Sequence, residues 1–355
     1  MAFQKGQFQR ALTIWYYRNG RDLPWRRTRD PYAVLVSEFM LQQTRVSTVI
    51  PYYTNWLRRF PDFGSLARAS EDDVLHAWQG LGYYARARNL HITAKIVLDQ
   101  NQGHFPRSVD EMQQLPGIGK YTAHAVASFA FNQSLPIVEA NTARVLTRLF
   151  DFRKAIDSEV GCEALWRYAA TLVPKSNAWN YNSALLDLGA LVCIPRQPKC
   201  GICPMKKFCR AKNPAALPIK KPGLRPKRLI EKHALVVRRG RILLEQSSSR
   251  WRGMWILPPV KPGSFKHPNF HGRAIYTSVF PFTTHQVAFK VYAGGLRKID
   301  SGKNRVAVAN KNSQRWIRIE SLDSVPMPSP HRRAMRHLLS EPAAARPHRQ
   351  QSSGS

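Results

Sequence analysis

Four cysteines gathered in one short stretch are the clearest chemical signal in this 355-residue sequence. Cys193, Cys200, Cys203 and Cys209 follow one another with six, two and five residues between them. Thiolates spaced this closely bind a soft metal centre, which is either tetrahedral zinc or an iron–sulfur cluster. Zinc sites usually pair two short knuckles, and only Cys200 and Cys203 have that form, so the uneven spacing favours a [4Fe–4S] cluster. The fifth cysteine, Cys162, is expected to be a small buried residue.

A carboxylate on an apolar helical stripe is the second candidate for chemistry. Asp30 and Pro31 form a good helix start, with the aspartate as the cap and the proline at the first helical position. At helical spacing, Glu38 follows Val34 by one turn and precedes Leu41 by about one turn. Burial on such a stripe would raise the pKa of the carboxyl group and make it a general acid. This stretch alone leaves open the alternative that Glu38 bends out into solvent.

A glycine-rich turn between two helical runs is the third candidate. Residues 115–122 read LPGIGKYT, in which one residue separates Gly117 from Gly119. Such glycines let the backbone turn tightly and expose its N–H groups, and the positive end of the following helix adds to an anion site. The pattern predicts a helix–hairpin–helix phosphate clamp. The alternative is an ordinary turn between two helices.

The surrounding sequence predicts helices that would position these groups. Between residues 1 and 213, apolar residues recur at spacings of three and four, and Pro and Gly separate the runs. A linker is expected at 214–229, because residues 213–228 hold four prolines and five Lys or Arg. The first 213 residues are therefore predicted to form one mainly α domain.

Beyond the linker the pattern changes to short strands. The predicted strands are 234–238, 241–245, 274–279, 286–293 and 315–318. Arg239 and Gly240 suit a tight hairpin turn between the first two. An α+β domain is therefore expected at 230–340, followed by a disordered tail at 341–355 that is rich in Ala, Arg, Gln and Ser.

The charge balance points to a polyanionic partner. Lys and Arg number 55 against 22 Asp and Glu, which gives a formal charge of +33 spread along the chain. Nucleic acid is the leading partner, although a ribosome-associated protein or a binder of anionic membranes would fit the charge alone. The sequence has no apolar stretch of about 18 residues and no apolar signal-peptide core, so no membrane contact is expected. Sparse cysteines suit a reducing compartment, and we expect a cytoplasmic, nucleoid-associated protein of bacterial type.

With the hairpin and the cysteine loop in one chain, the sequence resembles the helix–hairpin–helix DNA glycosylases that carry an iron–sulfur cluster. Three stretches narrow the match to the MutY-type adenine DNA glycosylases: 21–26 (RDLPWR), 38–44 (EFMLQQT) and 80–88 (GLGYYARAR). That family removes adenine mispaired with 8-oxoguanine. The resemblance is dense over residues 8–210 and looser over 230–340, where the family has a Nudix-like domain that reads 8-oxoguanine.

This resemblance implies a fold and an activity. The fold would be a helix–hairpin–helix catalytic domain with a [4Fe–4S] loop at 1–213 and an α+β Nudix-like lesion-recognition domain at 230–340. That second part contains no Nudix hydrolase box, which fits recognition without pyrophosphatase chemistry. Endonuclease III-like relatives carry a lysine nucleophile directly after the hairpin, where this chain has Tyr121. The implied activity is that of a monomeric, monofunctional glycosylase of base excision repair, acting on A:8-oxoguanine or A:G mispairs in double-stranded DNA.

The resemblance also implies roles for single residues of the catalytic domain. Glu38 would be the catalytic acid that protonates adenine N7. Glu139 stands where the family has an aspartate that stabilises the sugar cation, and the helix that starts after it should keep it ionised. Gln42 and Tyr83 would enter the base stack near the lesion. The residues that would line the pocket for the extruded adenine are Arg21, Leu23, Trp25, Arg26, Tyr121, Ser183 and Leu186.

In the second domain, the resemblance places lesion reading at a short loop. The family's loop reads Phe-Ser-His, and the nearest stretch here is 282–285 (FTTH). Thr284 and His285 are therefore expected to read the lesion, with the aromatic wedge missing or moved to Phe282.

Two competing interpretations remain open on the sequence alone. One is a mismatch thymine or uracil glycosylase on the same fold, which would be expected to lack both the second domain and Glu38. The other is a non-catalytic DNA-binding module that keeps the hairpin and the cluster for affinity. A carboxylate on the apolar stripe of a helix argues against the second interpretation.

Overall fold

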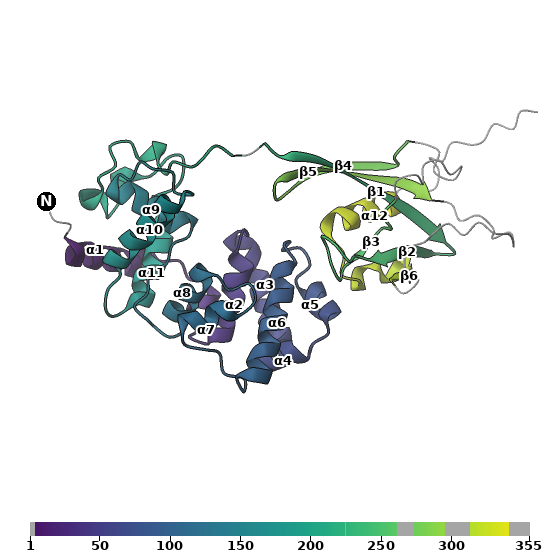
Figure 1. Ribbon diagram of the computed structural model, residues 1–355, viewed down its shortest axis with the longest axis horizontal. Coiled ribbons are helices and arrows are strands. Elements are labelled where there is room, and N and C mark those ends of the chain that lie inside the picture. Colours follow the sequence, from purple (N-terminus) through teal and green to yellow (C-terminus); the bar gives the residue numbers. More distant parts are fainter. Residues whose placement is uncertain (1–3, 224, 261–272, 295–312, 341–355) are drawn as a thin grey trace, which may run out of the picture. The chain divides into compact units, whose positions relative to one another are not determined.

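Two compact units make up the chain in the computed structural model, which describes residues 4–223, 225–260, 273–294 and 313–340 (Figure 1). The first unit comprises residues 1–69 and 85–223, and the second comprises residues 70–84 and 224–355. The segment Ser70–Tyr84 thus groups with the C-terminal part, although the sequence pattern assigned it to the helical domain. The predicted tail at 341–355 lies outside the described residues.

The first unit is built from helices, as the sequence predicts. Its helices are α1 (Lys5–Asn19), α2 (Pro31–Leu41), α3 (Val46–Arg59), α4 (Phe63–Arg68), α6 (Ala85–Gln100), α7 (Val109–Gln114), α8 (Lys120–Phe129), α9 (Ala140–Phe150), α10 (Glu159–Leu172) and α11 (Ala178–Asp187). A π-helical turn, Leu188–Val192, continues α11 directly into the cysteine loop.

Helix α2 lies at the centre of this unit. Every residue from Tyr32 to Met40 is buried, because α2 contacts α3, α6 and α8. A helix that is apolar nearly all round must be surrounded by other elements, and its few polar groups then lie in a medium of low polarity. The buried Tyr32 hydroxyl donates a hydrogen bond to the Phe60 carbonyl oxygen at 2.7 Å.

A second group of helices packs beside it. Side chains from α1, α9, α10 and α11 share one core, which includes Phe8, Leu146, Leu165 and Leu185. This core brings the start of α9, the end of α11 and the cysteine loop into one body. Among the described residues, no helix is both long enough and apolar enough to cross a membrane.

The second unit contains a mixed six-stranded sheet. Its strands are β1 (Lys227–Arg238), β2 (Arg241–Gln246), β3 (Trp255–Ile256), β4 (Tyr276–Phe282), β5 (His285–Gly294) and β6 (Gln314–Arg318). The order is β3-β2-β1-β5-β4, with β6 paired to β2, and among the described strand pairs only β1 and β5 run parallel. Helices α12 (Ser329–Ser340) and α5 (Glu71–Ala77) complete the unit, and α12 joins Phe289 and Leu244 in its core.

Two details of the sheet compare directly with the sequence. Arg239 and Gly240 both have positive φ, 47° and 69°, so the predicted tight turn between the first two strands is confirmed. The linker prediction for 214–229 is wrong at its end, because β1 already begins at Lys227. Backbone pairing of Lys227 with His285 of β5 holds this basic stretch in the sheet.

Candidate active site

Helix α2 places Glu38 inside the helical unit. Asp30 caps the helix by accepting hydrogen bonds from the backbone N–H groups of Tyr32 and Ala33, both at 3.1 Å. Glu38 sits two turns further on and is only 5% exposed, so its side chain does not bend into solvent. Burial raises the pKa of Glu38 to about 7, against a hydrogen bond from Tyr121 that lowers it. A carboxyl group with this pKa can hold a proton at neutral pH.

Glu139 forms the N-cap of α9, as expected from its place before a helix start. Its Oε1 accepts from the backbone N–H groups of Asn141 at 2.7 Å and Thr142 at 2.8 Å, and its Oε2 accepts from Asn141 Nδ2 at 3.2 Å. These bonds favour the ionised form. Burial is nevertheless the larger effect and raises the pKa of Glu139, so the helix start offsets desolvation only in part.

Tyr121 joins the two carboxyl groups. It lies in the first turn of α8, and its hydroxyl is hydrogen-bonded to Glu38. Burial and the charges of Glu38 and Glu139 raise the pKa of the phenol well above its ordinary value, so Tyr121 stays protonated and donates. The structure therefore brings together Glu38, Glu139 and Tyr121 from α2, α9 and α8.

The loop between α1 and α2 contributes the residues predicted for the base pocket. Leu23 and Trp25 are buried, and the Trp25 ring packs edge-to-face on Tyr53 at 5.4 Å between ring centroids. The charge of Arg26 lowers the pKa of Glu38, so the guanidinium acts on the carboxyl group electrostatically. Arg26 also lies over the Tyr16 ring at 5.6 Å.

Asp187 binds two of the residues predicted for the base pocket, and the sequence reasoning missed it. It ends α11, is fully buried, and binds two arginines of the loop, Arg21 and Arg26. Arg26 donates to it through both terminal nitrogens at 2.8 and 2.9 Å, and Arg21 donates through Nε at 2.7 Å and the backbone N–H at 2.8 Å. Its partners lie more than 160 residues away along the chain, so no local pattern marks it.

Helix α11 also carries Ser183 and Leu186. Ser183 is buried and its carbonyl oxygen lies 3.5 Å from Arg26 Nη2, whereas Leu186 is half-buried. Both therefore belong to the helix that supplies Asp187. Their roles toward a base stay predictions.

Arg86 fixes the end of α2, where Gln42 follows. This buried arginine of α6 donates to the carbonyl oxygens of Phe39 at 2.8 Å and Met40 at 3.0 Å, and also to that of Gln42. It thereby satisfies carbonyl groups that the helix leaves without partners at its C-terminus. Gln42 itself is half-buried, and Tyr83, in the second unit, is exposed with a φ of 48°.

The predicted hairpin lies between α7 and α8, and its two glycines differ. Gly117 has a φ of 79°, and a Cβ there would lie 2.7 Å from Asn89 Nδ2 and 3.2 Å from Phe39 Cε1. Gly119 has an ordinary extended φ of −87° and caps α8 without a side chain, and a Cβ added to it would meet no atom within 4 Å. Gly117 is required by the turn itself, whereas the space into which a Gly119 side chain would project is open.

The cysteine loop follows the π turn after α11. Arg148, which is buried, donates to Cys193 Sγ at 3.2 Å and to the carbonyl oxygens of Ile194 at 2.8 Å and Pro195 at 2.6 Å. Burial, with the nearby thiols adding to it, raises the pKa of Cys203 to about 11. Among the described residues no three His, Cys, Asp or Glu side chains are close enough for a single metal ion, and a multi-iron cluster needs a wider spacing. Four half-buried thiols on one rigid loop fit such a cluster.

Comparison with known proteins agrees with this geometry. Residues 36–169 match the HhH-GPD superfamily of base excision DNA repair proteins, and residues 193–209 match the iron–sulfur binding domain of endonuclease III. The adenine DNA glycosylase of Buchnera aphidicola subsp. Schizaphis graminum is 35% identical over 260 residues, which cover 71% of this chain and 74% of the relative. The chain belongs to the adenine DNA glycosylase family.

Other relatives of this family match over a smaller part of their length. The human adenine DNA glycosylase is 44% identical over 215 residues, covering 58% of this chain and 39% of the human protein. The Mycolicibacterium smegmatis enzyme is 45% identical over 200 residues, covering 56% and 67%. The chain therefore spans less than half of the human relative.

Solved structures establish the fold of the first unit. A thermostable thymine-DNA glycosylase superposes with a TM-score of 0.54 at 32% identity, covering 58% of this chain and 95% of that chain. An endonuclease III in complex with DNA gives a TM-score of 0.50 at 22% identity and shows the shared fold alone. The predicted helix–hairpin–helix glycosylase fold is thus confirmed, and the iron–sulfur match, which runs from Cys193 to Cys209, confirms the [4Fe–4S] cofactor.

In this adenine DNA glycosylase family member, the predicted lesion-reading residues form a two-residue turn. Phe282 pairs with His285 across β4 and β5, which leaves Thr283 and Thr284 as the turn, with Thr283 at a φ of 48°. Thr284 is exposed, and its hydroxyl lies 3.3 Å from His285 Nδ1. The Phe282 ring lies under the Arg250 guanidinium at 4.3 Å.

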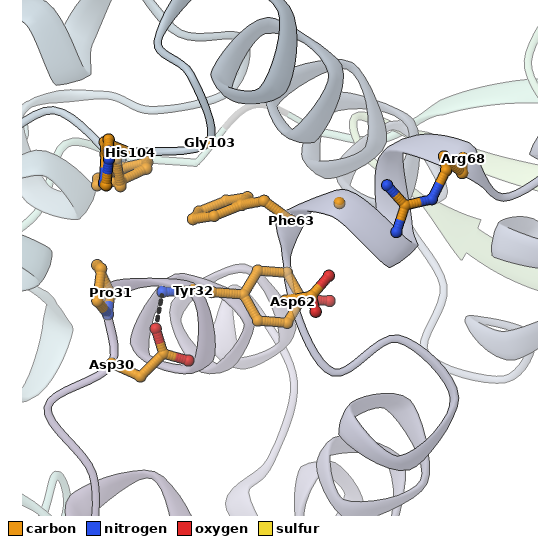
Figure 2. Close-up of a pocket in the computed structure, with 10 residues that line it drawn as sticks. Asp30, Pro31, Tyr32, Asp62, Phe63, Arg68, Gly103 and His104 are labelled. Carbon is orange, nitrogen blue, oxygen red and sulfur yellow. Dashed lines mark hydrogen bonds between the residues drawn. The ribbon is translucent and has the colours of Figure 1, made fainter.

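A hollow at the other end of α2 has no comparable chemistry. Figure 2 shows Asp30, Tyr32, Asp62 and Phe63 on its wall, with Arg68 and His104 nearby. Both carboxylates already cap helices, Asp30 for α2 and Asp62 for α4. This hollow lies two turns of α2 away from Glu38.

Cys162, expected to be buried, is in fact exposed, because α10 presents it on its outer side.

Proposed function

We propose that this protein is a monofunctional adenine DNA glycosylase that excises adenine mispaired with 8-oxoguanine or guanine in double-stranded DNA. The observation that carries the proposal is the buried Glu38, whose pKa is raised to about 7 beside Glu139 and Tyr121. Two carboxyl groups in unlike surroundings suit glycosidic bond cleavage, in which one gives a proton and the other stabilises positive charge.

The chemistry divides between these two groups. Glu38, protonated, would donate its proton to N7 of the extruded adenine, which makes the base a better leaving group. Glu139 would supply negative charge near the sugar as the bond breaks and an oxocarbenium-like state develops. Water would then add to C1′ of the sugar cation and give its proton to the Glu38 carboxylate, which restores the acid. Tyr121 occupies the position of the lysine in lyases, and its hydroxyl donates to Glu38, which supports hydrolysis without a Schiff base.

DNA binding in this proposal uses the hairpin and the basic surface. The target base must leave the duplex, which costs a few kcal/mol that intercalating Gln42 and Tyr83 would offset. Gly117 and Gly119 would receive a phosphate, and the formal charge of +33 supports steep weakening of binding by salt. A monomer bound at the bacterial nucleoid is part of the same proposal.

The second unit would read the base opposite adenine. A mixed sheet with α12 supports a Nudix-like domain, and the exposed Thr284 beside the half-buried His285 would donate and accept hydrogen bonds at a guanine edge. Phe282 would support the turn from below through Arg250 instead of entering the duplex.

A mismatch thymine glycosylase is the second candidate function. The 32% identity to a thermostable thymine-DNA glycosylase supports it. This chain, however, carries Glu38 and a C-terminal unit, which were not expected of such an enzyme, and the family relatives favour adenine.

The deciding experiment is a base-excision assay on four labelled duplexes that differ in one pair: A:8-oxoguanine, A:G, T:G and C:G. Alkali-dependent cleavage at adenine in the first two duplexes is the expected result, and Glu38→Gln should abolish it while duplex binding persists. Cleavage at thymine alone would establish the second candidate. Cleavage without alkali would contradict the monofunctional assignment, and cluster-loaded protein that cleaves none of the four would refute the proposed function.

A further inference from the structure

Asp187 holds more donors than any other carboxylate of the helical unit for which bonds are described. Its Oδ1 receives Arg21 Nε at 2.7 Å, Arg21 Nη2 at 2.6 Å and Arg26 Nη2 at 2.9 Å. Its Oδ2 receives Arg21 N and Arg26 Nη1, both at 2.8 Å. The carboxylate is fully buried, while the side chains of Arg21 and Arg26 are 27% and 10% exposed.

This arrangement is built for position as well as for charge. A buried carboxylate that is fully paired stays ionised, and burial, which alone would raise the pKa of Asp187, is outweighed by Arg26 and Arg21, so that its pKa is lowered. Bidentate pairing also fixes the plane of each guanidinium. Without Asp187, two guanidinium groups would be left partly buried and unpaired.

We propose that Asp187 is the positioning residue of the base pocket: its carboxylate holds Arg21 and Arg26 in place and balances part of their charge beside Glu38. The inference deepens the proposed adenine glycosylase function and rests on it for the identity of the base. Asp187 itself acts through the arginines and need not touch substrate.

The charge balance has a consequence at the catalytic acid. The groups that act on Glu38 are Tyr121 from α8, Glu139 at the start of α9 and Arg26 from the loop before α2. Arg26 favours the ionised form of Glu38, and the negative Asp187 partly cancels that influence. Removing the charge of Asp187 should therefore lower the pKa of Glu38, because more positive charge would remain beside it.

The test compares Asp187→Asn with Asp187→Glu in single-turnover excision of adenine, measured across pH. The Asn variant should lose about 100-fold in rate, since the arginines lose their fixed geometry. The alkaline limb of its pH–rate profile should move to lower pH. The Glu variant keeps the charge but not the length, so it should lose rate while its alkaline limb stays in place. The matched control is Asp22→Asn, which removes an exposed carboxylate paired with Arg27 in the same loop and should change neither quantity.

A second readout does not depend on excision. The carboxyl carbon of Glu38, assigned by its absence in Glu38→Gln, can be titrated by carbon-13 NMR in the free holoprotein. Asp187→Asn should lower its midpoint, and Asp187→Glu should leave it unchanged. If wild type excises no adenine, the proposed function fails, and this titration still decides the role of Asp187.

A double-mutant cycle covers the case in which Asp187→Asn folds poorly. The variant Arg26→Gln combined with Asp187→Asn removes one charge of each sign and should be more stable than Asp187→Asn alone, with rate effects that do not add. Fully additive effects, or an Asn variant with wild-type rate and an unmoved Glu38 titration, would overturn the inference.

Discussion

At the residue scale, the two carboxyl groups of the site differ in what surrounds them. Glu38 lies within an apolar helix with one hydrogen bond from Tyr121, whereas Glu139 receives three from Asn141 and Thr142. The charge of Glu139 also raises the pKa of Glu38, although less than burial does. Glu139, whose carboxylate accepts more hydrogen bonds, should lose its proton first and stay charged while Glu38 stays protonated.

The pH dependence of excision follows from this difference. Because Glu38 must be protonated to act as the acid, kcat/KM should fall as pH rises through its pKa of about 7. Rates of adenine excision between pH 5 and 9 measure this limb. The free energy of unfolding should change in the same direction. Folding raises the pKa of Glu38, which favours the folded state at low pH, and this contribution is lost as pH rises from 4.5 to 7. A flat profile up to pH 9 would remove Glu38 from the role of acid.

Glu139 provides a second test at this scale. Aspartate is a good helix cap, so Glu139→Asp should keep both the fold and most of the activity. Glu139→Gln keeps an oxygen for the cap but loses the charge, and we expect the excision rate to fall about 100- to 1000-fold with little change in melting temperature. Thermal melts and single-turnover rates on one duplex separate the two effects. Equal rates for Gln and wild type would assign the cation-stabilising charge to another group.

The sequence singled out Glu38 and Glu139 but not the residues that surround them. The apolar stripe of α2 is a local pattern, so Glu38 could be singled out from spacing, whereas Glu139 was singled out by the family resemblance and by its place before a helix start. Asp187 could not, because its partners are Arg21 and Arg26 at the other end of the helical unit's sequence. The exposure of Cys162 was also mispredicted, since residue type says little about which side of α10 faces the core.

At the element scale, the two glycines of the hairpin between α7 and α8 should affect different properties, stability and DNA binding. Gly117→Ala should destabilise the protein, because its φ of 79° costs an L-residue about 1–2 kcal/mol and its methyl would meet Asn89. Gly119→Ala should leave the melting temperature unchanged, since its backbone is ordinary and the site is open. The second variant should instead weaken duplex binding, measured by fluorescence anisotropy. Unchanged affinity in Gly119→Ala would contradict a phosphate at this turn.

Helix α9 links the catalytic site with the cysteine loop. It starts at the Glu139 cap, and one turn later Arg144 donates to Asn141 Oδ1 at 2.8 Å and to the Cys193 carbonyl oxygen at 2.7 Å. Arg148, one further turn on, holds Cys193, Ile194 and Pro195. One helix therefore orders both Glu139 and the first cysteine of the loop.

Replacing Arg148 by methionine tests this link. Methionine keeps an apolar stem of similar length but leaves the carbonyl groups of the loop unpaired, each at a cost of about 1–3 kcal/mol. We expect Arg148→Met to lower the iron content and the melting temperature together, measured on protein purified without oxygen. Arg196→Met, at an exposed position of the same loop, is the control and should retain iron. Full iron content in Arg148→Met would show that the thiols alone order the loop.

At the scale of the whole molecule, the division into units does not follow the chain. Segment Ser70–Tyr84 groups with the C-terminal sheet through Gln79, whose Oε1 accepts from the Met327 backbone N–H and from Arg332 Nη2, both at 3.0 Å. Tyr83, the residue expected in the base stack, therefore lies in the same compact unit as Thr284 and His285, which are expected to read the lesion.

Gln79→Ala should loosen this segment selectively. Both donors would lose a partner, so amide hydrogen exchange should accelerate at Met327 and across residues 70–84 while the helical unit keeps its protection. Gln113→Ala, an exposed position on α7, serves as the control. Unchanged exchange in segment 70–84 would mean that packing of α5 alone holds it to the sheet.

The fold of the whole chain was predictable in outline. Helical spacing located the first unit, and alternation with turn residues located five of the strands, whereas β3 has two residues and is too short for any pattern. The grouping of α5 with the sheet depends on tertiary contacts of Gln79 and Gly253, which no local period encodes. The early start of β1 was hidden because a basic, proline-rich stretch is stabilised by its partner strand and not by its own composition.

The π turn Leu188–Val192 makes the connection between Asp187 and Cys193 sensitive to its length. Its closing bond, from the Cys193 N–H to the Leu188 carbonyl oxygen at 2.7 Å, spans one residue more than an α-helical bond. Loss of one codon here would restore regular α geometry and rotate Cys193 by about 100° relative to Asp187. The length of this segment should thus be more tightly constrained than its composition: an in-frame deletion of one residue would uncouple cluster and pocket, while apolar exchanges within it would pass.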